Sequence, residues 1–279
     1  MKKKHSQAIF ERGTAAIKAL GIFEDRYFCP ICGEGFETLT RLTKEHVPPK
    51  SVGGKVVILT CKSCNELAGH RYEMDLSKRQ EVISQMQCIV ENTDGDFGHI
   101  KFKVGDISLN SNLSHSNGIT RFEITDHNDP KALDASIDIL NAFGQSDKIS
   151  IQTRKSFRRE NIERSDLKAA FLALAAKFGY VIAFDKRMVP VRKAILCMED
   201  HGDLIHYIDL PAEFSGKILI DEQKGVAAIR IEDRGVIIPW PSHPLSNFKR
   251  RGSKLTLEAK IFEFPIFFEA IVDLKQLNR

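Results

Sequence analysis

Two Cys-x-x-Cys pairs lie in the first quarter of this 279-residue chain and constrain its fold more than any other feature. The pairs are Cys29 with Cys32 and Cys61 with Cys64, and the 28 residues between them include a Glu-His step. Four thiolates at this spacing suit tetrahedral Zn²⁺, with Zn–S bonds of about 2.3 Å. Because the enclosed loop is longer than the roughly 15 to 20 residues of a plain zinc ribbon, we expect a structural zinc site that frames a second, polar centre.

The composition is that of a globular protein, with 42% apolar and 28% charged residues. No apolar run approaches the ~18 residues of a membrane-spanning helix. The basic N-terminus, residues 1–6, is not followed by the apolar stretch of a signal peptide, which favours a cytoplasmic protein. In such a reducing compartment the paired cysteines are expected to bind metal, with redox chemistry at one pair and four unrelated cysteines as the alternatives.

Positive charge is concentrated in the cysteine-rich part of the chain. Residues 1–80 contain 14 Lys and Arg against 9 Asp and Glu, whereas the remaining residues contain 27 against 28. Phosphate backbones attract such a surface, although an excess of this size is also within ordinary scatter. Two further basic runs, at residues 154–159 and 248–254, are candidates for phosphate contact or are merely solvated.

The predicted fold class is α+β, with an N-terminal zinc module and a larger mixed α/β C-terminal domain. A loop at residues 92–98 favours a boundary there, which gives a domain at 1–91 and a domain at 92–279 for substrate selection, sensing or association. Apolar periodicity and alternation predict the following elements: helices at 6–20, 133–143 and 167–178, and strands at 56–59, 100–104, 120–124, 217–220, 226–231, 236–238 and within 255–270.

The Glu-His step, Glu45-His46, and Asn65 offer the chemistry of a hydrolase. A neutral imidazole such as that of His46 can take a proton from water near neutral pH. The oxygens of Glu45 and Asn65 are donors that a hard divalent cation prefers, and such a cation stabilises charge on a phosphodiester. The alternative interpretation of His46 is an exposed histidine in a proline-bounded loop.

Residues 27–75 contain, in order, Cys-x-x-Cys, Glu-His-Val-Pro-Pro-Lys, Gly-Gly, an apolar strand and Cys-x-x-Cys-Asn-x-x-x-Gly. This order resembles the zinc-framed branch of the HNH endonuclease family. The resemblance implies a ββα-metal fold in which the four cysteines hold structural Zn²⁺ and Mg²⁺ or another divalent cation acts in catalysis. It also implies that His46 is the general base and that Glu45 and Asn65 bind the catalytic cation.

One position departs from the family pattern. The residue five before the third cysteine is Val56, where the family usually has an asparagine that orients the loop bearing the base. The backbone of Gly53-Gly54 is a candidate for that orienting role.

Two polar residues follow Asn65 on the same predicted helix. Glu73 comes eight residues later, which returns to about the same side of a helix, so Glu73 is a further candidate ligand of the cation. His70 points more to the flank and is a candidate for phosphate contact. A solvated helix face is the alternative for both.

The sequence therefore predicts a metal-dependent HNH-type endonuclease that hydrolyses phosphodiester bonds, with double-stranded DNA as the expected partner. His46 would take a proton from the attacking water, while the cation held by Glu45 and Asn65 would stabilise the departing 3′ oxygen. Restriction, homing and phage-defence enzymes are the analogues. The alternatives are a non-catalytic zinc module that binds nucleic acid or a protein, and a zinc-stabilised interaction protein without a nucleic-acid partner. Oligomeric state stays open, a homodimer included.

Overall fold

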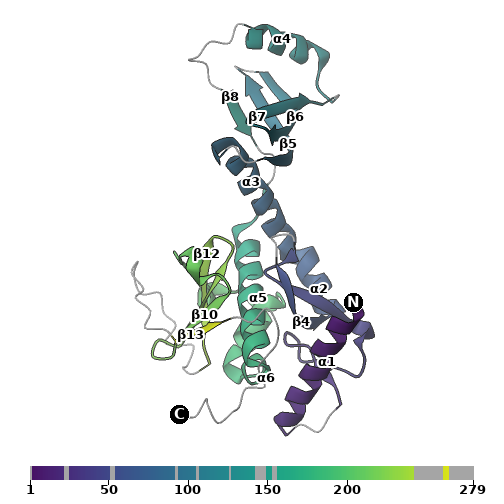
Figure 1. Ribbon diagram of the computed structural model, residues 1–279, viewed down its shortest axis with the longest axis vertical. Coiled ribbons are helices and arrows are strands. Elements are labelled where there is room, and N and C mark those ends of the chain that lie inside the picture. Colours follow the sequence, from purple (N-terminus) through teal and green to yellow (C-terminus); the bar gives the residue numbers. More distant parts are fainter. Residues whose placement is uncertain are drawn as a thin grey trace. The chain divides into compact units, whose positions relative to one another are not determined.

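The computed structural model describes residues 2–21, 25–50, 54–91, 94–104, 107–125, 127–141, 149–152, 156–241 and 260–263. The chain divides into two compact units, drawn as ribbons in Figure 1. The first unit joins residues 1–74 to residues 158–279, and the second consists of residues 75–157. Residues 154, 155 and 248–254 of the two basic runs lie outside the described residues.

The N-terminal part of the first unit contains two antiparallel hairpins and their flanking helices. Tyr27 and Leu59 pack against Ile9 of the first helix, which ends before Gly21, where a φ of +79° suits glycine. A strand hairpin followed by a helix reproduces the expected ββα order. The elements are α1 (Lys2–Ala19), β1 (Tyr27–Phe28), β2 (Gly35–Phe36), η1 (Leu39–Arg41), β3 (Leu42–Val47), β4 (Lys55–Cys61), α2 (Lys62–Ala68) and the π-helical turn η3 (Gly69–Glu73).

The C-terminal part of the first unit is built around one long helix, α5 (Arg159–Phe178). Its residues from 165 to 176 are all buried, as expected for a helix that is covered on every side. Figure 1 shows why: a sheet packs on one side of α5, and the β3–β4 hairpin lies on the other. The remaining elements are α6 (Tyr180–Ala183), η4 (Lys186–Met188), α7 (Val189–Ile195), η5 (Gly202–Leu204), β9 (His206–Ile208), η6 (Ala212–Phe214), β10 (Lys217–Asp221), β11 (Val226–Ile231), β12 (Arg234–Pro239) and β13 (Lys260–Glu263).

The sheet of the first unit has the strand order β13-β10-β11-β12-β9, and all of its neighbouring strands are antiparallel. Its apolar residues join those of α5 and of the cysteine module in one core. Trp240 lies in this core and packs edge-on against Phe178, with ring centroids 5.1 Å apart.

The second unit is a helix, α3, followed by a four-stranded antiparallel sheet with the order β7-β6-β5-β8 and one covering helix, α4. Ile100, Leu109 and Leu113 form its small core, against which Ala132 of α4 packs. The elements are α3 (Met74–Glu91), β5 (Gly95–Val104), β6 (Ile107–Ser116), β7 (Ile119–Ile124), α4 (Pro130–Asn141) and β8 (Ile149–Gln152).

The α+β class is confirmed, but the structure divides the chain differently from the expected boundary between residues 91 and 92. The segment from residue 158 onward packs with the cysteine module rather than with residues 92–157. The reason is α5, whose apolar surface is buried against both neighbours, so tertiary packing and not chain order sets the boundary. Within the described residues, no helix has the length and apolar character needed to cross a membrane.

Candidate active site

The four cysteines of the two Cys-x-x-Cys pairs converge in the first unit. Their sulfur atoms all lie within 4.8 Å of one another. Cys29 and Cys32 occupy the turn between β1 and β2, where Gly33, with a φ of +80°, donates its N–H to the carbonyl of Cys29. Cys61 ends β4 and caps α2, so its sulfur accepts the N–H of Cys64 at 3.4 Å. A tetrahedral Zn²⁺ suits this donor set, and such an ion would tie both hairpins to the start of α2.

Backbone and cationic groups surround these sulfur atoms. The N–H of Cys61 donates to the sulfur of Cys29 at 3.4 Å. Arg192 of α7 lies over the ring of Phe184 at 5.6 Å, and its charge interacts with the thiols of Cys32 and Cys29. Because four thiolates with Zn²⁺ carry a net charge of about −2, a guanidinium at this position stabilises the loaded site.

Glu45 of β3 is buried and faces the helices of the first unit. The Glu45 side chain is only 5% exposed, and its Oε2 accepts a hydrogen bond from the hydroxyl of Thr60 at 3.0 Å. Its Oε1 accepts from Nζ of Lys168, which comes from α5, at 3.0 Å. The same Nζ also donates to Oε1 of Glu73 at 2.7 Å.

Lys168 therefore joins two carboxylates that are 28 residues apart in the sequence. Burial alone would lower the pKa of Lys168, but the charges of Glu45 and Glu73 outweigh burial and hold that pKa above its ordinary value. Burial raises the pKa of Glu73 and Lys168 opposes the shift. Two carboxylates thus share one ammonium.

His46 follows Glu45 on β3 and is partly exposed. The strand register is irregular between Glu45 and His46, and Val56 of β4 lies directly opposite His46. Among the described residues, no hydrogen bond partner is found for the imidazole, which leaves its nitrogens available to water. Burial, followed by the charges of Lys50 and Lys44, lowers the pKa of His46 below 6.5.

Gly54 lies close to the Pro48-Pro49 segment that follows His46. The N–H of Gly54 donates to the carbonyl of Pro49 at 3.3 Å. A Cβ at position 54 would lie 1.4 Å from the carbonyl oxygen of Pro48, so only glycine permits this approach. The backbone of Gly54 thus contacts the Pro48-Pro49 segment that follows His46, whereas Gly53 lies outside the described residues.

Asn65 lies on α2 and is tied to the strand that carries the Glu-His step. Its Nδ2 donates to Oγ1 of Thr43 at 3.1 Å, which leaves Oδ1 without a partner among the described residues. Thr43 and Glu45 are two residues apart on β3, so they share a face of the strand. The structure therefore brings Asn65 and Glu45 to one side of the hairpin, while no hydrogen bond connects either of them to His46.

Of the two other candidates, only Glu73 lies in the buried cluster. Glu73 is 16% exposed and ends the π-helical turn η3, so ideal α-helical spacing from Asn65 does not apply to it. A solvated face was the alternative for this residue, and its contact with Lys168 rules that alternative out. His70 is exposed at the same turn.

Sequence reasoning missed Lys168, Thr60 and Arg192. Lys168 lies in the helix predicted at 167–178, which is buried. The sequence did contain a sign of the role of Lys168, which is a lysine inside the apolar run Leu167-Lys168-Ala169-Ala170. A lysine that is buried in such a run needs an anionic partner.

The comparison with known families supports this geometry. Residues 29–81 match the model of a family described as HNH endonuclease, and the match covers the four cysteines, the Glu-His step and Asn65. This confirms the resemblance to the zinc-framed branch for that segment. No curated protein and no solved structure gives a significant match to the chain.

A catalytic divalent cation is compatible with the residues present. Each carboxylate oxygen of Glu45 accepts one hydrogen bond and keeps a further lone pair, and Oδ1 of Asn65 is available. Glu45 and Asn65 are thus the residues that would hold the ion, and Glu73 is a further candidate, since Lys168 bonds Glu45 and Glu73 alike.

Proposed function

We propose that the first unit is a divalent-cation-dependent nuclease of the HNH type that hydrolyses phosphodiester bonds, with double-stranded DNA as its substrate. The observation that supports the proposal is the cysteine-framed β3–β4–α2 arrangement within the HNH match, a segment that contains Glu45, His46 and Asn65. A nuclease role in restriction or phage defence belongs to the same proposal, by analogy with related enzymes.

The chain's own residues supply proton transfer and positioning. The neutral imidazole of His46 takes a proton from a water molecule, and the resulting hydroxide attacks phosphorus. The bond from phosphorus to the 3′ oxygen breaks, and that oxygen takes a proton from solvent. A divalent cation held by Glu45 and Asn65 would supply Lewis-acid stabilisation of the charge on the phosphodiester.

A supercoiled-plasmid assay with Mg²⁺ or Mn²⁺ tests this proposal. The parent protein is expected to convert the plasmid to nicked or linear forms, and His46→Ala is expected to lose this activity by at least a hundredfold, a typical contribution of a general base. His5→Ala is the matched control, because His5 lies on α1, outside the residues that match the family. Equal cleavage by parent and His46→Ala, or none by a folded, zinc-loaded parent, would overturn the proposal.

The second candidate function is a non-catalytic zinc module that binds nucleic acid, and one observation favours it. The residue opposite His46 on β4 is Val56, which has no polar group to orient the base. Under this alternative, parent and His46→Ala bind DNA equally and neither cleaves it.

A further inference from the structure

The sheet of the second unit has two faces of different character. Alternate residues of β6, among them Leu109 and Leu113, are buried beneath α4. The opposite face of β6 is formed by Ser108, Asn110, Asn112, Ser114 and Ser116, all of which are at least partly exposed. An antiparallel sheet with one buried face is expected to have a polar outer face, so polarity alone identifies no ligand.

The composition of this outer face is unusual for a solvated strand. Five successive outward positions of β6 have only Ser and Asn, without a single charge. Asparagine is depleted in strands because its side chain competes for backbone hydrogen bonds. Nδ1 of His99 lies 2.7 Å from Oδ1 of Asn112, so the amide of Asn112 is held in place on the face.

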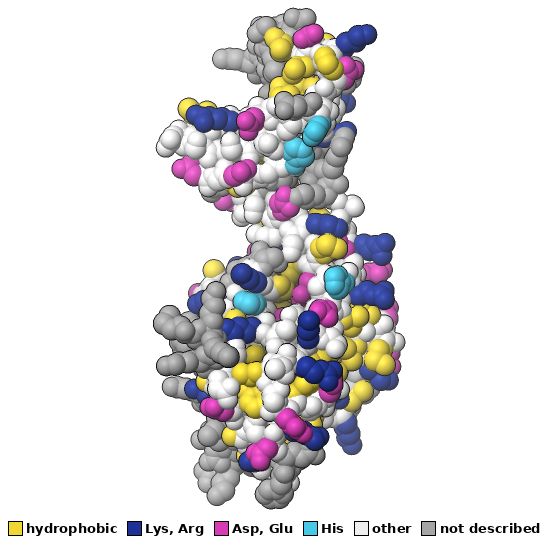
Figure 2. Space-filling view, turned by 90° about the vertical axis from the view of Figure 1, so that its right-hand side faces the viewer, with side chains coloured by type: hydrophobic (Ala, Val, Ile, Leu, Met, Phe, Trp, Pro, Cys, Tyr) yellow, Lys and Arg dark blue, Asp and Glu magenta, His cyan; other side chains and the backbone are white. Residues whose placement is uncertain are grey.

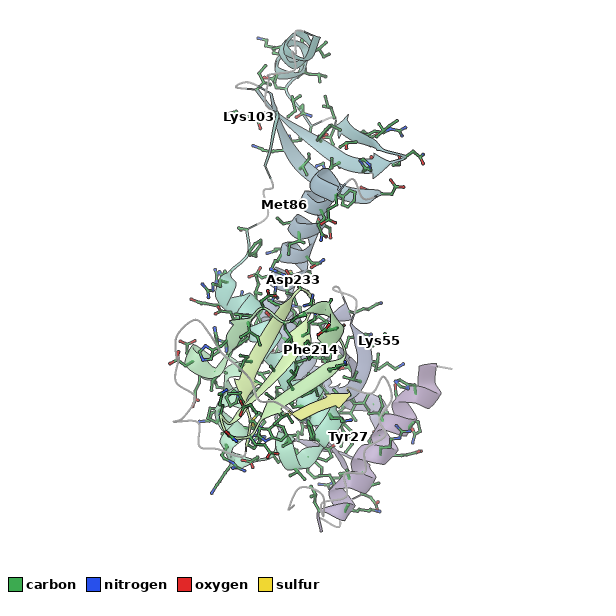
Figure 3. All side chains as sticks on the ribbon, turned by 60° about the vertical axis from the view of Figure 1, so that its left-hand side comes forward. Tyr27, Lys55, Met86, Lys103, Phe214 and Asp233 are labelled. Carbon is green, nitrogen blue, oxygen red and sulfur yellow. The ribbon has the colours of Figure 1, made fainter. Side chains whose placement is uncertain are left out.

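Cations flank this uncharged strand on both sides. On β5, Lys101 lies opposite Asn110 of β6, and Lys103 lies opposite Ser108 of β6. On the other side of β6, Arg121 of β7 lies opposite Ser114. Figure 3 labels Lys103, next to the end of β5. In the part of the chain that the structure describes, these three cations have no ion-pair partner. Unneutralised charges on one face favour a polyanionic ligand.

The acidic residues of the face lie away from the two lysines. Glu123 is on the edge strand β7, opposite Asn112. Asp96 is at the start of β5, beyond a register shift, and its Oδ1 accepts the N–H of Gly98. At about 3.3 Å per residue, Asp96 and Lys101 are roughly 17 Å apart along the strand. The positive end of the face is therefore the end near residues 101–110.

We propose that the outer face of this sheet binds double-stranded DNA, with Lys101, Lys103 and Arg121 on phosphates and Asn110 and Asn112 toward base edges. Phosphate contacts position a protein on the duplex, and asparagine is a side chain that pairs with adenine in the major groove. The strands β5 and β6 are the two central strands of the sheet, so the cations of β5 and of the edge strand β7 lie on both sides of the asparagines. This inference rests on the proposed nuclease function, for which it supplies the substrate-selecting surface.

The test measures binding of full-length, zinc-loaded protein to duplex DNA by fluorescence anisotropy at several salt concentrations. All variants carry His46→Ala, so that no cleavage accompanies binding. Lys101→Gln with Lys103→Gln is expected to weaken binding at least tenfold and to lower the slope of log K against log salt by about 2, since each phosphate contact contributes about 0.9. The control is Lys131→Gln with Lys186→Gln, which removes the same charge from exposed positions off this face and is expected to stay within twofold.

Each outcome decides between the claims. Equal losses in the double variant and the control overturn the inference, as does tighter binding of duplex RNA than of duplex DNA. If the parent cleaves plasmid and the Lys101/Lys103 variant binds normally, the nuclease proposal stands and the proposal that the sheet face binds DNA is overturned. If the parent binds DNA through the lysines but does not cleave it, the sheet-face proposal stands and the nuclease proposal is overturned.

Discussion

Nζ of Lys168 lies 3.0 Å from Oε1 of Glu45, which links a helix of the C-terminal segment to the strand that carries the Glu-His step. The side chains are 2% and 5% exposed, so solvent screens the pair little. Glu73 shares the ammonium at 2.7 Å. The HNH-matching segment is consequently completed by Lys168, which lies 87 positions beyond its end at residue 81, and the segment alone would lack this cation.

We expect Lys168→Met to destabilise the first unit by about 3 to 5 kcal/mol, because removing one partner of a buried ion pair leaves uncompensated charge. Trp240 is the only tryptophan of the chain and is buried in this unit, so urea unfolding followed by its fluorescence measures the effect. Adding Glu73→Gln should recover part of the loss. The exposed-site control Lys186→Met should change stability by less than about 0.5 kcal/mol; a similarly small change for Lys168→Met would show that the ion pair is not needed.

Gly54→Ala is expected to reduce plasmid cleavage strongly while the protein stays folded and zinc-loaded. The added Cβ would meet the carbonyl oxygen of Pro48 at 1.4 Å, so the loop after His46 must move. Single-turnover cleavage rates and zinc content measure the two effects separately. Gly69→Ala is the control, because a Cβ at Gly69 meets nothing within 4 Å. Parent-like cleavage by Gly54→Ala would show that this loop does not position the base.

The pH dependence of cleavage should follow the lowered pKa of His46. The base acts in its neutral form, so activity is lost as pH falls through that pKa, and the acid limb of kcat/KM should have its midpoint below 6.5. Burial is the main cause, with Lys50 and Lys44 as further ones. Lys50→Gln removes a positive charge, raises the pKa of His46 and should shift the acid limb to higher pH. A shift to lower pH would contradict this assignment.

Zinc removal should unfold the N-terminal part of the first unit, since structural Zn²⁺ contributes roughly 10 to 16 kcal/mol in small zinc modules. Atomic emission should find one zinc per chain, lost in Cys64→Ser. Hydrogen bonding with Cys29, supported by Cys64 and opposed by Cys32, lowers the pKa of Cys61 to about 7. Metal binding needs thiolates, so zinc affinity should fall as pH decreases.

Arg192→Met should keep the fold and weaken zinc affinity about tenfold, the lower end of the range for groups that support metal ligands. Competition with a chromophoric chelator measures the affinity, with Arg187→Met as the control, because Arg187 pairs with Asp185 instead. Unchanged zinc affinity would show that the guanidinium does not stabilise the thiolates.

Local patterns predicted the zinc cluster and most of the regular elements. The four sulfurs converge because their spacing in the sequence determines a local geometry, whereas the position of Val56 opposite His46 comes from the strand register and was not predicted. The expected helix at 167–178 begins earlier, at Arg159, because its first turns are mostly charged and partly exposed and show no apolar periodicity; an ion pair between Arg159 and Glu163 lies within them. The residues at 95–98, expected in a loop, pair in β5.

Long-range packing could not be predicted in the same way. No pattern within residues 27–75 shows that α5 covers the hairpin or that Lys168 reaches Glu45. The positive net charge of the first 80 residues also did not predict a nucleic-acid-binding surface. In Figure 2, basic and acidic side chains are interspersed over the face displayed. A net charge counts residues, whereas a binding surface depends on which of them the fold leaves side by side without partners.

The most direct measurement of the central claim is the chemistry of the cut ends. Plasmid nicked by the parent protein with Mg²⁺ should carry 3′-hydroxyl and 5′-phosphate ends, because the 3′ oxygen is the leaving group, and DNA ligase should reseal it. A parallel reaction with His46→Ala should leave the plasmid supercoiled. Ends with a 3′-phosphate that ligase cannot join, or nicking that persists at the parent rate without the imidazole of His46, would contradict the account.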